Sequence, residues 1–323
     1  MSAFETSFNA VVPIFLMMII GFTAKKLKFI GPEFVTQATK FVFRISLPAM
    51  IFSKVAAIDL STGIELSQLY LMVFCGVGVF VAYLISKLVA KIYLKEAINN
   101  RGYVAGAFMQ GAFRSNYMII GYPVLLNLFG DDIIVNMALV TLVVIPAFNV
   151  ISIIALTQPN QHASSKKYIT ILINVAKNPL IIGIILGFVS SYLKVDYPLY
   201  IDSFITMTGN LAPPLALVAI GAFFHFDDFK DTLKNVLGVV TLKLVLIPIL
   251  MTGLAYLLGF SDMNIILIAV LFGGPSAVSS FAMSSEMGGD AVLSGNIVIL
   301  TSGLCVISYV AIISIWISIL GIV

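Results

Sequence analysis

The stretch FRSNYMIIGYP, residues 113–123, places an arginine, a serine and an asparagine in succession inside an apolar run. The planar guanidinium of Arg114 has the geometry to bind a carboxylate through two parallel hydrogen bonds. Ser115 and Asn116 are residue types that cap the start of a helix, so a half-helix is expected to begin around Tyr117. The stretch therefore predicts an anion-binding group beside an interruption in a helix.

A second stretch, LFGGPSAVSS, residues 271–280, predicts a matching interruption. Gly273 and Gly274 release the chain from helical geometry, and Pro275 suits the first position of a new helix because it lacks a backbone N–H. Each interruption leaves unpaired N–H groups at the positive end of a helix dipole. Two such ends and an arginine converging on one point would form an anion site. The predicted substrate-binding residues are Arg114, Ser115, Asn116, Tyr117, Asn149, Gly274, Pro275 and Ser276.

The sequence leaves two interpretations of Arg114 open. Its guanidinium either binds the anion or binds carbonyl groups at the end of the first half-helix and stabilises the break. Asn149 and Asn296 are uncharged polar groups in apolar segments, which either hydrogen-bond between helices or line a cavity. Ser279 and Ser280 follow the second break, but serines are common in tightly packed membrane helices without a role in binding.

Lys40 and Arg44, four residues apart on one helix face, are expected to extend to the cytoplasmic surface, with a role in substrate entry as the alternative. Lys177 and Lys243 are expected to mark interfaces. Cys75 and Cys305 lie in apolar stretches without metal-ligand spacing, which predicts buried, inert thiols. The sequence offers no nucleophile with a base, no paired acids and no metal cluster, so we expect neither an enzyme nor a metal or cofactor site. No acidic residue falls at mid-membrane. This argues against a side-chain carboxylate that binds and carries protons or sodium, as in antiporters.

The composition predicts the elements that must position these groups. Of 323 residues, 60% are hydrophobic and only 10% are charged, and the mean hydropathy is +1.09. These values are typical of an all-α polytopic membrane protein. Because about 20 apolar residues are needed to cross a bilayer, charges and turn residues divide the chain into ten spans, at 8–28, 34–55, 66–92, 102–129, 133–157, 169–193, 198–224, 235–259, 263–286 and 291–321.

The basic residues predict the orientation of these spans. One set of alternate loops holds Lys25, Lys26, Lys28, Lys87, Lys91, Lys95, Arg101, Lys166, Lys167, Lys230 and Lys234, and the other set holds only Lys54 and Lys194. The positive-inside rule places the first set in the cytoplasm and both termini outside it. The same rule accounts for the net charge of +3, because the basic residues lie in short clusters between apolar runs. The charge therefore does not indicate a nucleic-acid partner.

Internal similarity divides the chain into a first repeat over 1–157, a short cytoplasmic linker over 158–167 and a second repeat over 168–323. NAVVPIFLMMIIGF matches NVAKNPLIIGIILGF, and Pro48 matches Pro214, at an offset of 166 residues. FGDDIIVNMALVT matches GGDAVLSGNIVILT at an offset of 159, which places Asn116 on Pro275. Since each half would hold five spans, an odd number, the halves are predicted to be inverted, as in many secondary transporters.

The motifs ISLPAMIFSKV, FRSNYMIIGYPVLLNLFG, AKNPLIIGIILGF and FGGPSAVSSFAMSSEMGGDAVLSGNIVILTS, in this order along almost the whole chain, resemble the auxin efflux carrier family. The resemblance implies ten spans in a 5+5 inverted repeat, related to bile-acid symporters and sodium/proton antiporters, with broken helices 4 and 9 crossing near Asn116 and Gly274-Pro275. The chain lacks the long loop that plant members carry after the fifth span, which makes it more similar to bacterial malate or malonate carriers.

The function expected from these features is secondary-active or facilitative transport of small organic anions across the cell membrane, with a carboxylate bound where the broken helices cross. Three points stay open at the level of sequence: the anion, the coupling to protons or sodium, and a homodimeric assembly. One alternative is a sodium-coupled organic-anion symporter. Another is a membrane sensor that keeps a carrier fold for binding alone.

Overall fold

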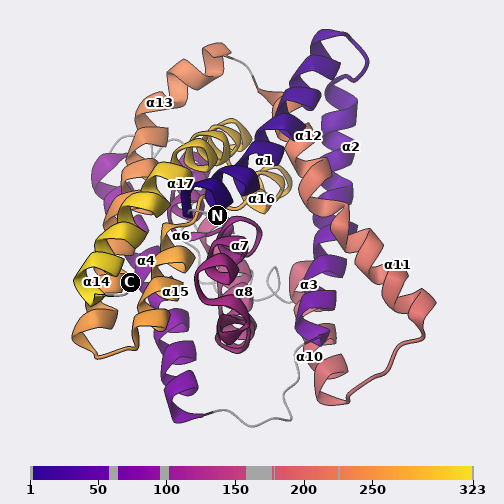
Figure 1. The fold of residues 1–323 in the computed structure, drawn as a ribbon. Helices are drawn as coiled ribbons and strands as arrows, with labels where there is room; N and C mark the ends of the chain where they lie inside the picture. The colour runs from indigo at the N-terminus through magenta and orange to yellow at the C-terminus, as the bar shows by residue number, and fades with distance from the viewer. Residues whose placement is uncertain are drawn as a thin grey trace, which may run out of the picture.

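The computed structural model describes residues 3–57, 65–94, 102–157, 177, 179–224 and 226–321. The described residues form helices joined by turns (Figure 1). The α-helices are α1 (Ala3–Lys26), α2 (Pro32–Phe41), α3 (Leu47–Ala56), α4 (Leu66–Tyr93), α6 (Gly102–Phe113), α7 (Tyr117–Phe129), α8 (Ile134–Thr157), α10 (Pro179–Tyr192), α11 (Leu199–Asn210), α12 (Ala212–Phe223), α13 (Phe226–Thr241), α14 (Ile247–Leu257), α15 (Asp262–Gly273), α16 (Ser279–Met287) and α17 (Ala291–Leu320).

The outer surface of the molecule is apolar. Along α4, Val73, Val77, Phe80, Leu84 and Leu88 recur on one face and are all exposed. An apolar helix face without a protein neighbour is typical of a surface that meets lipid. Five of the described helical stretches are long and apolar enough to cross a membrane: Leu66–Tyr93, Leu139–Thr157, Leu199–Phe223, Phe229–Leu257 and Ala291–Leu320.

Two long helical stretches contain a π-helical turn immediately before a proline. The turns are η1 (Val42–Ser46) and η4 (Leu242–Leu246), and Pro48 and Pro248 lie in the first turn of the helix that follows each of them. The N–H of Leu47 reaches back five residues to the carbonyl of Val42. A proline ring clashes with the carbonyl four residues earlier, so the wider turn lets the helix continue past the proline.

Both interruptions predicted from the sequence are present. Helix α6 ends at Phe113 and α7 begins at Tyr117, while α15 ends at Gly273 and α16 begins at Ser279. The two extended segments pair through an antiparallel bridge between Ser115 and Ser276, and the N–H of Asn116 donates to the carbonyl of Pro275 over 2.8 Å. The crossing is therefore a short two-stranded contact inside a helical protein.

The second break is longer than predicted. We expected the new helix to begin at Pro275, but α16 begins four residues later, at Ser279. Because Pro275 and Ser276 pair with Asn116 and Ser115, their backbone is extended rather than helical. Pairing between the two breaks thus overrides the preference of proline for the first turn of a helix.

Two glycines at the predicted repeat offset make equivalent contacts. A Cβ atom on Gly21 of α1 would lie 2.0 Å from the Val218 carbonyl oxygen of α12, and one on Gly187 of α10 would lie 3.1 Å from the Phe52 carbonyl oxygen of α3. Gly187 follows Gly21 by 166 residues, and Val218 follows Phe52 by the same number, so each repeat supplies the glycine of one contact and the partner of the other. Figure 1 shows α1 beside α12 in its upper half and α10 beside α3 in its lower half.

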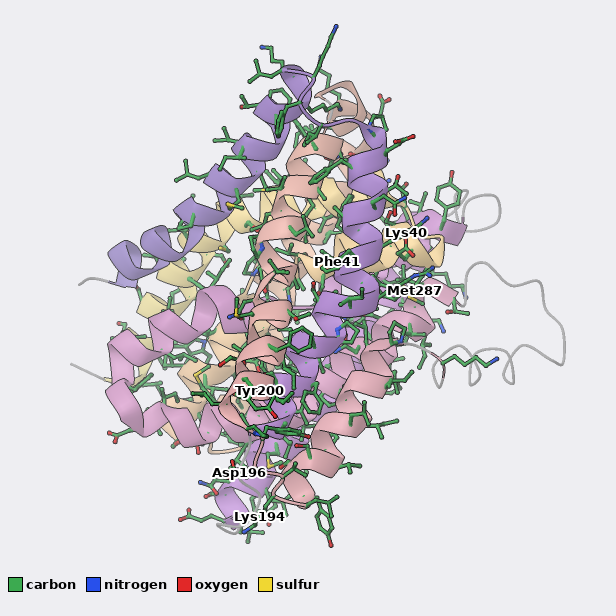
Figure 2. All side chains as sticks on the ribbon, turned by 90° about the vertical axis from the view of Figure 1, so that its right-hand side faces the viewer. Lys40, Phe41, Lys194, Asp196, Tyr200 and Met287 are labelled. Carbon is green, nitrogen blue, oxygen red and sulfur yellow. The ribbon has the colours of Figure 1, made fainter. Side chains whose placement is uncertain are left out.

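Some sequence predictions fall partly outside the described residues. The span predicted over 169–193 is described as a helix only from Pro179, and the linker at 158–167 is not among the described residues. The turn between α10 and α11 carries Lys194 and Asp196, which lie at the lower end of the molecule in Figure 2, below Lys40 of α2.

Candidate anion site at the helix crossing

A cavity of about 250 Å³ opens at the crossing of the two breaks, and we call it the Arg114 cavity. Its wall is made by α3, the first break with the start of α7, α8, the junction of α11 and α12, and the segment that leads into α16. Five of the eight predicted site residues line it: Arg114, Ser115, Asn116, Tyr117 and Asn149. Tyr117 and Ser279, the first residues of the half-helices α7 and α16, both line this cavity.

The Arg114 side chain is only 6% exposed and is held by neighbours from α8 and α16. Its Nη1 donates to the Phe148 carbonyl oxygen at 3.3 Å and to Ser152 Oγ at 3.1 Å. Its Nη2 donates to Asn149 Oδ1 at 3.0 Å and to Ser279 Oγ at 2.9 Å. All four acceptors are uncharged, so they fix the orientation of the guanidinium without neutralising it.

These contacts bear on the alternative role considered for Arg114. The hydrogen bonds of its guanidinium go to α8 and α16, and none of those described goes to a carbonyl at the end of α6. The Phe113 carbonyl at that end accepts a hydrogen bond from Lys243 Nζ at 3.3 Å. Lys243 was expected at an interface, but it is fully buried. The cation that binds the end of the broken helix is thus Lys243, and a cation is the favourable charge at a helix C-terminus.

Three consecutive residues on the cavity wall each carry a buried polar atom without a hydrogen-bond partner among the described residues. These atoms are Arg114 Nε, Ser115 Oγ and Asn116 Nδ2. Buried polar atoms in folded proteins nearly always have a partner, and leaving one unpaired costs about 1–3 kcal/mol. Ser115 Oγ lies on the side of Gly274, inside the crossing. Arg114 Nε and Asn116 Nδ2 can each donate a hydrogen bond to an acceptor such as a carboxylate, and we call these two groups the donor patch.

Two other predicted residues line the cavity but also serve as structural contacts. Tyr117 is buried, and its hydroxyl is hydrogen-bonded to Thr141 Oγ1 at 2.5 Å. Asn149 accepts the hydrogen bond from Arg114 through Oδ1 and donates through Nδ2 to the Ile145 carbonyl oxygen at 2.8 Å. Asn149 therefore both bonds between helices and forms part of the wall, the two roles that the sequence left open.

Gly274, Pro275 and Ser276 do not line the cavity, contrary to the sequence prediction. Ser276 is fully buried, its Oγ donates to the Gly111 carbonyl oxygen at 2.5 Å, and its N–H donates to Thr301 Oγ1 at 3.1 Å. These residues are turned inward because their backbone pairs with the first break. They build the crossing, and Ala277 and Ser279 take their place on the cavity wall.

Sequence reasoning missed two polar residues of the wall, Lys54 and Asn210. Lys54 had been counted with the loop cations, but it lies in the last turn of α3. A helical pattern could have found it, since Leu47, Met50, Ile51 and Lys54 share one face of α3 and all line the cavity. Asn210 is the last residue of α11 and carries no comparable local signal.

The remaining candidates lie away from this cavity. Arg44 pairs with Glu286 at 3.3 Å, and its side chain is 66% exposed. Asn296 donates to Thr232 Oγ1 at 2.8 Å. Cys75 and Cys305 are buried free thiols, as predicted.

A larger cavity of about 860 Å³ lies between α4 and α14. Among the described residues of its wall, which are mostly apolar, Glu65 is charged and none is a lysine or arginine. A wall with an acid and without a cation does not suit an anion. The smaller Arg114 cavity is therefore the candidate site.

The sequence matches the model of a family described as membrane transport protein over residues 6–168 and again over 157–313. A Methanothermobacter thermautotrophicus protein named "Uncharacterized transporter" is 22% identical over 307 residues, which cover 94% of this chain and 97% of that protein. A Rhizobium meliloti protein named "Putative malonate transporter" is 26% identical over 284 residues, 86% of each chain. The mouse "Lysosomal cholesterol signaling protein" is 23% identical over 315 residues, which cover 90% of this chain and 35% of that protein.

Proposed function

The chain belongs to the membrane transport protein family, that of the auxin efflux carriers, and from this premise we propose that it carries small carboxylates such as malonate or malate by alternating access. The broader class is already given by the family: the protein is a multi-pass membrane transporter and not an enzyme. In the proposal, the anion binds in the Arg114 cavity, where both half-helices begin.

The observation that carries this proposal is the donor patch formed by Arg114 Nε and Asn116 Nδ2. Both groups are buried without a described partner, and the guanidinium is held only by neutral acceptors. A bound carboxylate would satisfy such donors and neutralise the charge at once. Charge-assisted hydrogen bonds of this kind are roughly twice as strong as those between neutral groups.

The size of the cavity supports a small substrate. Its volume of about 250 Å³ lies below the roughly 300–1,000 Å³ of pockets that bind drug-sized ligands. A short carboxylic acid of three or four carbons is consistent with such a space. The R. meliloti relative named for malonate supports the same choice of substrate class.

We further propose that the protein is a 5+5 inverted repeat of ten spans in the cell membrane, with both termini outside the cytoplasm and α6–α7 and α15–α16 as broken spans 4 and 9. The paired contacts of Gly21 and Gly187, separated by the offset of the sequence repeat, support a two-fold relation between the halves. The double match of the family model supports it independently.

The test uses purified protein and malonate, with Arg114→Gln and Arg114→Lys as variants. We expect Arg114→Gln to fold but to bind malonate at least about tenfold more weakly, the loss of one charge-assisted hydrogen bond. Arg114→Lys keeps the charge but loses the planar fork, so its affinity should lie between those of Arg114→Gln and the wild type. Binding is measured by calorimetry, melting temperature by thermal unfolding, and flux by uptake into proteoliposomes with and without sodium.

The matched control is Arg44→Gln, which removes an arginine that is exposed and outside the cavity. It should bind and transport malonate like the wild type. A well-folded Arg114→Gln protein with unchanged affinity and flux would overturn the proposal. Binding without flux in the wild type would favour a sensor instead, and flux that needs sodium would favour the symporter.

A further inference from the structure

Lys54 is a second cation on the wall of the Arg114 cavity. It lies in the last turn of α3 and is only partly exposed. Arg114 approaches the cavity from the first break, between α6 and α7. The two cations therefore enter one small space from different helical elements.

The charge of this wall is not balanced by protein. Of the residues that the structure describes, the wall contains Lys54 and Arg114 but no aspartate or glutamate. Among the described residues, no carboxylate lies within ion-pair distance of the Lys54 ammonium, and no acceptor lies within hydrogen-bond distance of it. A cation that is partly withdrawn from water without a partner is unfavourable. The described residues of the wall carry a formal charge of +2 and no counter-charge.

The polar groups around the two cations are arranged to bind at both ends. Next to Arg114 in the chain is Asn116, whose Nδ2 has no partner among the described residues. Lys54 shares its face of α3 with Met50, and Asn210 at the end of α11 is a further neutral residue of the wall. One end thus offers a guanidinium whose Nε–H has no described partner, and the other offers a compact point charge.

We propose that Lys54 binds a second carboxylate of the substrate, so that the cavity selects short dicarboxylates over monocarboxylates. This inference rests on the proposed function, because the first carboxylate is the one held at Arg114. A dianion spans the cavity from the crossing to α3 and neutralises both cations, whereas a monoanion leaves one of them without a counter-charge. The preference for dicarboxylates then follows because a bound monocarboxylate leaves one of the two cations without a counter-charge, which is unfavourable.

The probes are two matched pairs: malonate with its monoamide, and succinate with its monoamide. Each monoamide keeps the size of its parent acid and removes one negative charge. The wild type should bind each dianion at least about tenfold more tightly than its monoamide, as expected for one charge-assisted contact. In Lys54→Met, a change that keeps an unbranched side chain with good helix propensity, dianion affinity should fall to the level of the monoamide while monoamide affinity stays unchanged.

Two further variants keep the test decisive. Lys54→Gln removes the same charge with a polar side chain and should give the same loss of selectivity, and it replaces Lys54→Met if that protein does not fold. The control is Lys40→Met, which removes an exposed lysine outside the Arg114 cavity and should keep the wild-type selectivity. Melting temperatures without ligand show whether each variant is folded.

The outcomes separate this inference from the proposed function. If the wild type binds neither dianion, the proposed function itself fails. If the wild type binds malonate or succinate and Arg114→Gln abolishes the binding, but folded Lys54→Met and Lys54→Gln keep their preference for the dianion, only the role of Lys54 is overturned. Equal affinity of the wild type for a dianion and its monoamide would likewise overturn it.

Discussion

Arg114 keeps its charge available to a ligand although it is almost completely buried. Its four protein partners are a backbone carbonyl, an amide oxygen and two hydroxyls, which hold the guanidinium in place. An arginine at the centre of a bilayer costs roughly 2.5–3.5 kcal/mol on insertion scales. Neutral acceptors lower this cost without cancelling the field of the cation, so an anion that reaches the cavity still gains from it.

Asn116 allows a test of the donor patch at the scale of one residue. Asn116→Asp keeps the shape of the side chain and a good N-cap for α7, but it replaces the unpartnered Nδ2 with a negatively charged group. We expect malonate affinity to fall at least about tenfold through like-charge repulsion, with little change in melting temperature. Asn116→Ala removes the donor without adding charge and should lose less. Calorimetry on both proteins measures their malonate affinities. If Asn116→Asp bound malonate as tightly as the wild type, the donor patch would not be the anion site.

At the scale of elements, the two breaks depend on each other although their sequences differ. The first is formed by polar residues and the second by glycine and proline, yet they meet through one bridge and one backbone hydrogen bond. Gly274 makes this approach possible, because a Cβ atom there would lie 2.6 Å from Ser115 Oγ and 2.7 Å from the Tyr309 hydroxyl. Its φ of −64° is open to any residue, so the requirement for glycine is one of space alone.

Gly274→Ala is therefore expected to destabilise the crossing by about 1–3 kcal/mol, the usual effect of overpacking a close contact. The matched control is Gly253→Ala in α14, where a Cβ atom would meet nothing within 4 Å. That change should stabilise the helix by about 0.5–1 kcal/mol, because alanine loses less conformational entropy than glycine on folding. Thermal unfolding in detergent compares the two proteins. A Gly274→Ala melting temperature at or above that of Gly253→Ala would contradict the close approach.

At the scale of the whole molecule, the cavity lies between elements from both halves of the chain. Residues of α3 and of the first break meet residues from the α11–α12 junction and the segment before α16. A ligand in this position contacts both proposed repeats at once. Movement of one group of helices past the other would then change the access to the site while the anion stays at the crossing.

The proposed orientation of the molecule is tested at its ends. Because the basic loops follow the positive-inside rule, we expect single cysteines near Ser2 or after Val323 to react with an impermeant thiol reagent from outside the cell. The background should be low, since Cys75 and Cys305 are buried, and replacing both by alanine removes it. A cysteine in the 158–167 linker is the control and should react only from the cytoplasm. Cytoplasmic labelling at the termini would reverse the topology.

The sequence by itself determined the class of the protein and the places where its helices break. A chain of which 60% of the residues are hydrophobic is typical of a protein surrounded by lipid. The Gly273-Gly274-Pro275 run interrupts a helix because glycine is conformationally free and proline lacks a backbone N–H. The same local chemistry identified Arg114 and Asn116, because a charged side chain beside helix-capping residues is conspicuous in an apolar run.

Only the tertiary structure decided which side chains reach the cavity. Pairing of the breaks turned Ser276 toward Gly111 and delayed the start of α16 to Ser279. Packing of α3 and α11 against the crossing brought Lys54 to the cavity, and packing inside the helical body placed Lys243 against the end of α6. A lysine near the end of an apolar helix has the same local sequence whether it points to water or to a cavity. The contacts that decide between them join segments far apart in the chain, and no local pattern records those contacts.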